Sequence, residues 1–256
     1  MKIAMIISGR LAGYENNLIP FLNNLTSNDI DINLFISIND TEKEYYEIAK
    51  KKLHKYLKGF NLESYNLPDI IITNHCCNYA GRRKIVPEKY KHGIYNCLSM
   101  YYNDNIAFNM ALTYSKTNNI TYDLYFKFRP DIIIIPDNIQ LLKKTILKSE
   151  NNMLYSIKPL THYMMQGIHK QMNLSDCFAW GKLNIMKKYM NTYNFILENV
   201  KKFNGDYWIW HEECITDCVY ENKLPFIFVN IPYTFDFKYK GSKQPNDSDF
   251  SYKNKW

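Results

Sequence analysis

Short apolar runs that alternate with helical stretches constrain this chain more than any other feature. The first run, Ile3–Ile7, is uninterrupted and ends at the turn sequence Ser8-Gly9-Arg10. A second apolar run, Ile32–Ile38, follows a stretch with helical character. Continuous apolar runs of this length are typical of strands buried on both faces, as in parallel sheets. The alternation therefore predicts an α/β fold with a mainly parallel sheet and helices on both faces.

The rest of the chain continues this alternation. We expect further strands at Asp69–Thr73, at Tyr122–Ile135 with a break at Pro130, at Met153–Ile157, at Cys177–Trp180 and at Phe226–Asn230. We expect helices within residues 14–26 with Pro20 in the first turn, from Thr41 to a stop at Gly59, at Asn96–Lys116, from a cap at Asp137 to Lys148, at Leu183–Phe203 and at Trp208–Glu221. Residues 74–91 look irregular and long enough to be a functional loop. The pattern predicts one domain over residues 1–235 and a polar tail over residues 236–256.

Composition narrows the class of protein. The 256 residues suit one domain, and 46% of them are hydrophobic, which argues against disorder. The six cysteines form no CxxC pair, so we expect reduced thiols. No signal peptide pattern opens the chain, and no stretch reaches the roughly 20 apolar residues of a membrane helix. These features predict a cytoplasmic protein without a transmembrane segment.

The formal net charge is +7, and the basic residues are dispersed along the chain. Dispersed surface lysines usually form a solvated face, while a basic excess also suits a polyanionic partner such as a diphosphate. A nucleic-acid-binding protein is one alternative, but the chain carries no known nucleic-acid motif. We therefore expect no nucleic-acid partner.

The end of the first strand is a candidate nucleotide-binding turn, because ligands of open α/β sheets bind beyond the carboxyl ends of the strands. Gly9 permits a tight turn, Ser8 offers a hydroxyl, and Arg10 can bind a phosphate with two parallel hydrogen bonds. An ordinary connection between a strand and a helix would have the same pattern. The chain contains neither GxGxxG nor GxxxxGK[ST], which argues against ordinary dinucleotide and P-loop sites.

The segment Arg129-Pro130-Asp131 is the strongest local signal. Charged residues within a central strand must pair, bind a metal or meet solvent. One interpretation is a neighbour pair of Arg129 and Asp131 or a simple bulge. The other is that Asp131 binds Mn²⁺ or Mg²⁺ together with substrate phosphates, because such ions commonly take only one or two protein carboxylates.

Three further acids are candidate catalytic residues. Asp176 precedes an apolar strand, and Glu212 and Glu213 lie in the first turns of a predicted helix. Each also has a structural explanation, because Asp begins turns and the helix dipole stabilises acids at helix starts. Trp208 and Trp210 beside them can stack a sugar or base, or equally pack in the core. His162, His169 and His211 lack a metal-binding spacing.

Taken in order, these motifs resemble the small GT-A-like glycosyltransferases of bacterial polysaccharide loci and large DNA viruses. The resemblance covers roughly Lys2 to Asn230. Its members are the strand Lys2–Arg10, the strand Asp31–Ser37, the segment Tyr122–Asp131 (similar to "YDLVIRxRxD"), the segment Ser175–Gly181 (similar to "DxFAxG"), and Glu212 with Ile215 and Val219 (similar to "ExxLxxxL").

The resemblance implies a single-domain, Rossmann-like GT-A fold and a hexosyl- or related transferase. A sugar would pass from a nucleotide-diphosphate-sugar donor to a glycan or other hydroxyl acceptor, with Mn²⁺ or Mg²⁺ assisting departure of the diphosphate. A viral member would act in the host cytoplasm. The alternative is a catalytically inactive module that binds a nucleotide-sugar or a glycan.

The resemblance also implies roles for single residues. Asp131 stands where the metal-binding Asp of a DxD-like motif falls, and Arg129 replaces the first Asp of that motif. The turn at Ser8, Gly9 and Arg10 would line the nucleotide. Asp176 would reach the donor sugar or acceptor hydroxyls, and Glu212 would activate the acceptor or bind a sugar. The chain departs from the family at Leu11-Ala12-Gly13, where an Arg is common.

Overall fold

The protein is described by a computed structural model that covers residues 1–9, 11, 14–73, 78–79, 82–83, 88–157, 174–203, 207 and 209–235. The predicted tail, residues 236–256, lies outside these ranges. So do Arg10, His162, His169 and Trp208, and the predicted roles of Arg10 and Trp208 stay predictions. None of the helices in the described part of the chain is long and apolar enough to cross a membrane.

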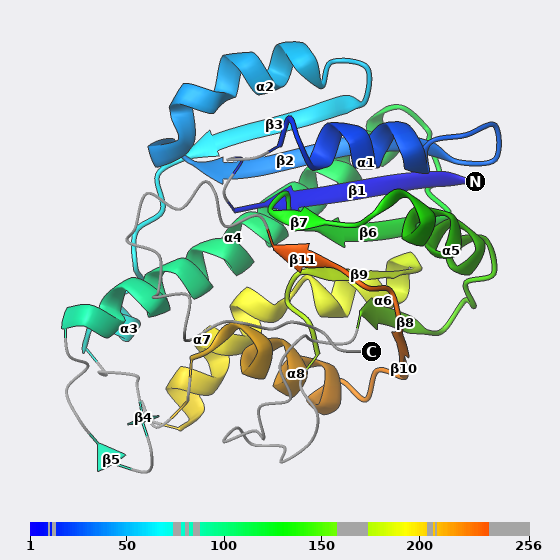
Figure 1. Ribbon diagram of the computed structural model, residues 1–256. Helices are drawn as coiled ribbons and strands as arrows, with labels where there is room; N and C mark the ends of the chain where they lie inside the picture. The colour runs from blue at the N-terminus through cyan, green and yellow to red at the C-terminus, as the bar shows by residue number, and fades with distance from the viewer. Residues whose placement is uncertain are drawn as a thin grey trace, which may run out of the picture.

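A single seven-stranded sheet forms the centre of the fold (Figure 1). Its strand order is β10-β8-β9-β6-β1-β2-β3. The bounds of these strands are Lys2–Ser8 (β1), Asp31–Asn39 (β2), Leu57–Glu63 (β3), Leu124–Phe128 (β6), Leu154–Ile157 (β8), Phe178–Gly181 (β9) and Phe226–Val229 (β10). All run parallel except β9, which pairs antiparallel with both β6 and β8. The predicted α/β class with a mainly parallel sheet is confirmed.

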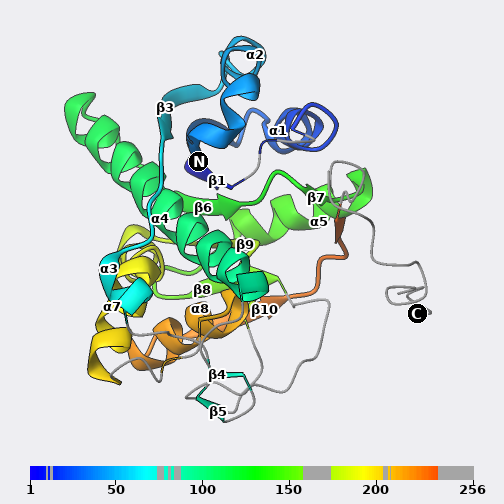
Figure 2. The same ribbon diagram turned by 90° about the vertical axis from the view of Figure 1, so that its left-hand side faces the viewer.

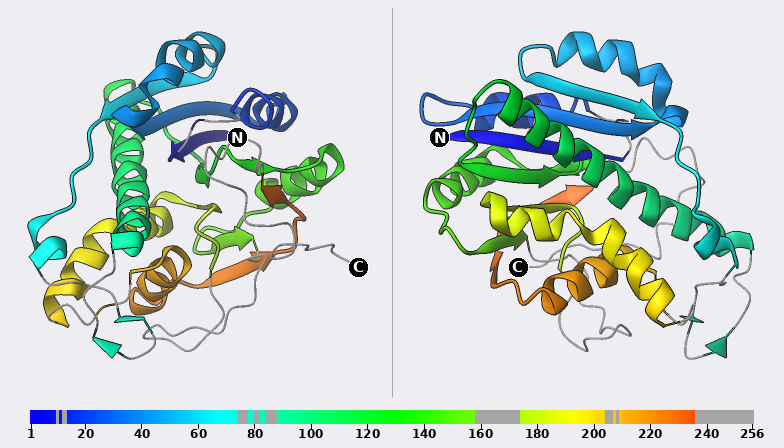
Figure 3. Two further views of the ribbon diagram at one scale, coloured as in Figure 1. Left: turned by 60° about the vertical axis from the view of Figure 1, so that its left-hand side comes forward. Right: turned by 180° about the vertical axis from the view of Figure 1, so that it is seen from behind.

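Helices cover both faces of this sheet, as Figures 2 and 3 show. On one face, α1 (Leu18–Leu25), α2 (Tyr46–Lys52) and α5 (Pro136–Leu147) pack on an apolar cluster that contains Ile3, Met5 and Ile7 of β1. The opposite face carries α4 (Glu88–Thr117), α6 (Leu183–Tyr189), α7 (Thr192–Lys202) and α8 (His211–Glu221), packed on Ala4 and Ile6. Successive residues of β1 thus contribute to different cores, which explains its continuous apolar sequence.

The remaining elements are short. A 3₁₀ turn, η1, spans Asp40–Tyr45, and α3 spans Asp69–Thr73. Two small antiparallel pairs lie outside the main sheet: β4 (Asn78–Tyr79) with β5 (Arg82–Arg83), and β7 (Ile132–Ile133) with β11 (Thr234–Phe235). The predicted break at Pro130 is confirmed, because the chain leaves the main sheet after β6 and forms β7 in the second pair.

Two sequence predictions were wrong in the region after β2. Asp69–Thr73 was expected to be a strand but forms the helix α3, since a run of three isoleucines is too short for its period to show. Gly59 was expected to end a helix but lies inside β3. A Cβ at Gly59 would lie only 3.0 Å from Phe35 and 3.4 Å from Met110, so this glycine permits close packing of the strand against its neighbours.

Two helix predictions also need correction. Leu183–Phe203 was expected to be one helix, but it is divided into α6 and α7 near Thr192, whose hydroxyl donates to the carbonyl of Tyr189. Asp137 was expected to cap α5. The cap position is instead Ile135, followed by Pro136 in the first helical position, so Asp137 lies within the first turn.

Candidate active site

The carboxyl ends of the parallel strands bring the candidate residues to one edge of the sheet. Ser8 ends β1, and Arg129 follows β6, which is the neighbour of β1. The antiparallel strand β9 begins at this same edge, so Asp176 lies beside Arg129, whose N–H donates to the carbonyl of Cys177. Residues 47 positions apart thereby become neighbours.

Gly9 lets the chain turn where β1 ends. Its φ of +89° lies in the region that L side chains rarely adopt. A Cβ would meet nothing within 4 Å, so the backbone conformation, and not lack of space, requires glycine. The described backbone at Gly9 therefore has the conformation that the predicted turn needs.

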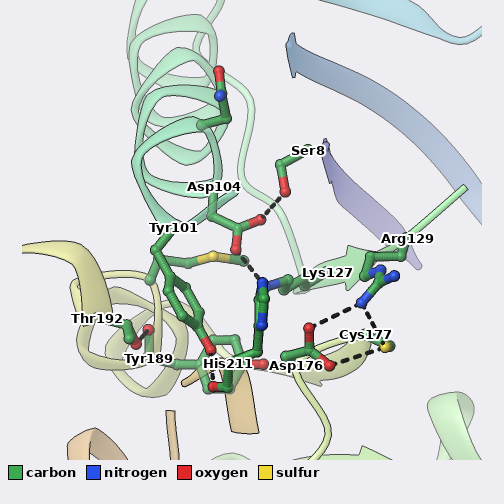
Figure 4. A network of polar contacts seen from close by, with 12 residues as sticks. Ser8, Tyr101, Asp104, Lys127, Arg129, Asp176, Cys177, Tyr189, Thr192 and His211 are labelled. Carbon is green, nitrogen blue, oxygen red and sulfur yellow. Dashed lines mark hydrogen bonds and ion pairs between the residues drawn. The ribbon is translucent and has the colours of Figure 1, made fainter. Parts of the chain in front are cut away.

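Ser8 faces inward at this edge and is buried. Its hydroxyl donates to Oδ1 of Asp104 on α4 at 2.6 Å, as Figure 4 shows. The other oxygen of Asp104 accepts from the Lys127 ammonium of β6. The hydroxyl of Ser8 thus belongs to an internal network, and its predicted contact with a nucleotide stays a prediction.

Lys127 and Asp104 form an ion pair that is almost completely removed from water, with side-chain exposures of 1% and 2%. The ammonium also lies 5.0 Å from the ring centre of Tyr101 and 6.0 Å from that of Tyr189. Burial raises the pKa of Asp104, while Lys127 and Ser8 oppose this by favouring the carboxylate. The pair fixes β1, β6 and α4 to one another beneath the site.

Arg129 holds the two acidic candidates together. Its Nε and Nη2 donate to the two oxygens of Asp131 at 3.1 and 2.7 Å. Its Nη1 donates to Asp176 at 2.9 Å, as Figure 4 shows. Nη1 also donates to the sulfur of Cys177, and the thiol of Cys177 donates to the other oxygen of Asp176. The predicted neighbour pair of Arg129 and Asp131 therefore exists, with Asp176 as a third member.

This environment sets the protonation of Asp176. Burial, the largest single effect, would raise its pKa, but Arg129, His211, Lys127 and the hydrogen bond from Cys177 together outweigh burial, and the pKa falls to about 2. Asp176 is therefore a carboxylate throughout the physiological range, with its oxygens engaged by Arg129 and Cys177. A carboxylate of this kind is a weak base, and it is suited to hold Arg129 in place.

Glu212 has the opposite environment. It lies in the first turn of α8 and is half-buried. Burial raises its pKa to about 7, and the negative charge of Asp176 adds to this effect. Its own backbone, Arg129 and Trp210 act in the other direction. A carboxyl with a pKa near 7 can accept and release a proton at neutral pH.

His211 and Glu213, the neighbours of Glu212 on α8, have environments that differ from that of Glu212. The His211 carbonyl accepts a hydrogen bond from the Tyr101 hydroxyl, and burial lowers the His211 pKa to about 4, so its imidazole is neutral at pH 7. Glu213 is only 8% exposed. Successive helix residues point about 100° apart, so Glu213 faces away from the direction of Glu212. Its predicted catalytic role stays a prediction.

Asp131 has the exposure and the free acceptor positions that one ligand of a divalent ion needs. Among the described residues, no three His, Cys, Asp or Glu side chains gather into a ready metal site. However, Mg²⁺ at phosphate sites commonly takes one or two protein carboxylates and fills its other positions with water and phosphate. Asp131 has a side-chain exposure of 30%, and Arg129 takes two of the roughly four acceptor positions that a carboxylate offers. With Asp176, the group around Arg129 has one more negative than positive charge, which favours a cation.

Sequence reasoning did not identify Lys127 and Asp104. A lysine within the apolar run Leu124–Phe128 was a signal, because a charge in a buried strand needs a partner. Asp104 gave no such signal, since it lies among polar residues of a long helix. Only the packing of α4 on the sheet brings the two together.

Glutamine at position 212 is expected to stabilise the protein in a pH-dependent manner. The folded state raises the pKa of Glu212, so the ionised form is disfavoured and stability is lost as pH rises from about 4.5 to about 7. Glu212→Gln removes this loss. We expect a gain on the order of 2 kcal/mol at pH 8 and almost none at pH 4, measured by urea unfolding. Glu198→Gln, at an exposed position of α7, is the matched control, and equal effects of the two variants would contradict the assigned environment.

Comparisons with known proteins give only distant structural likenesses. No family model matches the chain, and no curated protein matches it. Similar solved structures include a nucleoside-diphosphate-sugar pyrophosphorylase from Vibrio cholerae RC9, with 9% identity over 91% of this chain and 94% of that one, at a TM-score of 0.43. Others are mouse xyloside xylosyltransferase 1, with 10% identity over 89% and 84% at 0.40, and a glycosyltransferase involved in glycosylation of the PBCV-1 major capsid, with 11% identity over 90% and 82% at 0.36. Because these identities and TM-scores are low, we infer function from the side chains of the site alone.

Proposed function

We propose that the chain is a glycosyltransferase that moves a sugar from a nucleotide-diphosphate-sugar to a hydroxyl acceptor. The observation that carries this proposal is the pairing of two unlike groups at one edge of the sheet. The Arg129 guanidinium, together with a cation held at Asp131, would provide positive charge for a diphosphate, and Glu212 provides a carboxyl with a pKa of about 7. Asp176 contacts Arg129 and raises the pKa of Glu212 through its negative charge, which supports the action of both groups on one substrate.

In the proposed reaction, the bond between the anomeric carbon and the diphosphate oxygen breaks while the acceptor oxygen bonds to that carbon. The acceptor hydroxyl loses its proton to the Glu212 carboxylate, and the nucleoside diphosphate leaves with the electron pair. This single displacement inverts the anomeric configuration. Glu212 is the preferred base because the pKa of Asp176, about 2, makes Asp176 a weak one.

The positive charge of the Arg129 guanidinium stabilises the leaving group. The anomeric carbon develops oxocarbenium character, so charge accumulates on the departing diphosphate. Asp176 and Asp131 hold the Arg129 guanidinium in a fixed position, which limits the reorganisation needed to stabilise that charge. A divalent ion at Asp131, when bound, would supply further positive charge for the diphosphate.

A binding and turnover screen tests the proposed function. Nucleotide-sugars are added with and without Mn²⁺, and the melting temperature is measured, because ligands that bind the folded state raise it. We expect one class of nucleotide-sugar to stabilise the protein and to be converted to free nucleoside diphosphate and a product of inverted configuration. Stabilisation without any release of nucleotide would favour a binding module. No response to any nucleotide-sugar would reject the proposal.

Asp131→Ala tests the role of the acidic candidate on the donor side. We expect this variant to lose most of the donor-dependent stabilisation and about 100-fold or more in turnover, by analogy with the removal of one group that stabilises a transition-state charge. Asp137→Ala is the matched control, since Asp137 is an exposed acid of the nearby helix α5. Undiminished Mn²⁺-dependent turnover in Asp131→Ala would reject the role of Asp131.

A further inference from the structure

Trp210 is a large aromatic side chain that stays exposed beside the site. It is 49% exposed, whereas Trp180 is fully buried in the core. It occupies the cap position of α8, directly before His211 and Glu212. Its ring centre lies 5.9 Å from that of the His211 ring, at an interplanar angle of 81°. An indole with half of its surface in water leaves an aromatic face open to a ligand directly before Glu212 in the chain.

The polar end of Trp210 is directed to the candidate base. The indole N–H is close enough to the Glu212 carboxyl to lower its pKa, against the larger effect of burial. Tryptophan commonly presents an apolar face to one partner while its N–H binds another. Here the N–H serves Glu212, and the exposed surface of the ring remains accessible beside the carboxyl.

We propose that Trp210 forms the acceptor subsite and that the acceptor is a sugar ring, which stacks on the indole and presents a hydroxyl to Glu212. The C–H groups of a pyranose form an apolar face that matches an indole, while the hydroxyls at its rim reach neighbouring polar groups. This inference rests on the proposed function and deepens it by naming the acceptor class. Small alcohols and the hydroxyls of serine or threonine have no such face and would gain little from Trp210.

The donor side lies elsewhere in the same cluster. Arg129, which we assign to the diphosphate, is held by Asp131 and Asp176, and it belongs to the loop after β6. Trp210 and Glu212 belong to the start of α8. The two sides are contributed by separate segments of the chain, as a reaction between two substrates requires.

Three variants separate stacking from hydrogen bonding. Trp210→Ala removes the ring and the N–H, Trp210→Phe keeps an aromatic face without the N–H, and Leu183→Ala is the control at a residue of α6 that is 44% exposed. The donor is the nucleotide-sugar that stabilises the wild type most. The acceptor probes are the methyl glycosides of glucose, galactose, mannose and N-acetylglucosamine, with glycerol as the probe without a ring.

We expect Trp210→Ala to raise the KM for the best methyl glycoside by about tenfold, the usual scale of one aromatic contact, while Leu183→Ala leaves it unchanged. Trp210→Phe should keep a KM within about threefold of wild type, since the stacking face remains. It should also shift the midpoint of the rate–pH profile upward, because Glu212 loses a donor to its ionised form.

The outcomes distinguish failure of the acceptor subsite from failure of the proposed function. If wild type turns over a donor but Trp210→Ala has the wild-type KM for every glycoside, or glycerol is the only acceptor, the subsite is rejected and the transferase remains. If no nucleotide-sugar stabilises or reacts with the wild type, the proposed function fails and the subsite with it. Trp210→Leu, which fills much of the same volume without a ring, replaces Trp210→Ala if the smaller side chain impairs folding.

Discussion

Glu212→Gln is expected to lower the rate of sugar transfer by about 100- to 10,000-fold, the range that a positioned general base contributes. Glutamine keeps the size and hydrogen-bonding reach of the side chain but cannot accept the acceptor proton. In the wild type, the transfer rate should rise with pH through about 7, as Glu212 becomes ionised. In the variant, this rise should disappear.

The measurement is initial transfer rates from pH 5 to 9 with saturating donor. Glu198→Gln on α7 is the control for loss of an acid elsewhere on the surface and should leave the profile unchanged. Donor-induced stabilisation should persist in Glu212→Gln, which distinguishes a loss of proton transfer from a loss of donor binding. A wild-type rate and pH profile in Glu212→Gln would exclude this residue as the base.

Lys127→Met is expected to destabilise the protein by about 3–5 kcal/mol, because it leaves Asp104 as a buried carboxylate without its cation. Ser8 donates one hydrogen bond to Asp104, which cannot replace a full positive charge. The change is measured as the free energy of unfolding in urea at pH 7. Lys187→Met, at an exposed position of α6, is the matched control and should have little effect.

The double variant Asp104→Leu/Lys127→Met tests the physical cause. Removal of both charges leaves no uncompensated ion, and apolar replacements of a buried pair are often close to neutral. We therefore expect the double variant to be more stable than Lys127→Met alone. A double variant whose loss equals the sum of the two single losses would show that the charges do not interact, and the ion pair would then have no role in joining α4 to the sheet.

Much of the fold follows from local pattern. Ile3–Ile7 is apolar at every position, and Ile32–Ile38 is apolar except at Asn33 and Ser37, which indicates burial on both sides and hence helices on both faces of a parallel sheet. Pro130 lacks an N–H, so a break after β6 follows from its chemistry alone. The secondary-structure prediction was wrong at Asp69–Thr73, where the pattern was short. It was also wrong at Gly59, because glycine can end a helix or lie inside a closely packed strand.

Part of the site could also be predicted from the sequence. Ser8 was expected at the end of a strand, Arg129 at a break within one and Asp176 just before one, and parallel strands bring their carboxyl ends to one edge. The reversal of β9 was not expected from the sequence, yet it places Asp176 at that edge, where the antiparallel strand begins. Strand direction depends on which neighbours pair, and pairing is a long-range property that no local run encodes.

The sequence by itself determined the types of side chain available at the edge of the sheet and the alternation that builds the sheet, because periodicity and residue chemistry are local. Only the tertiary structure decided which charges meet and what those charges do. Asp104 pairs with Lys127 although α4 and β6 are separate in sequence, and two nearby acids acquire a pKa of about 2 at Asp176 and about 7 at Glu212. The physical reason is that desolvation and Coulomb interactions depend on distances in space, which are set when the chain packs.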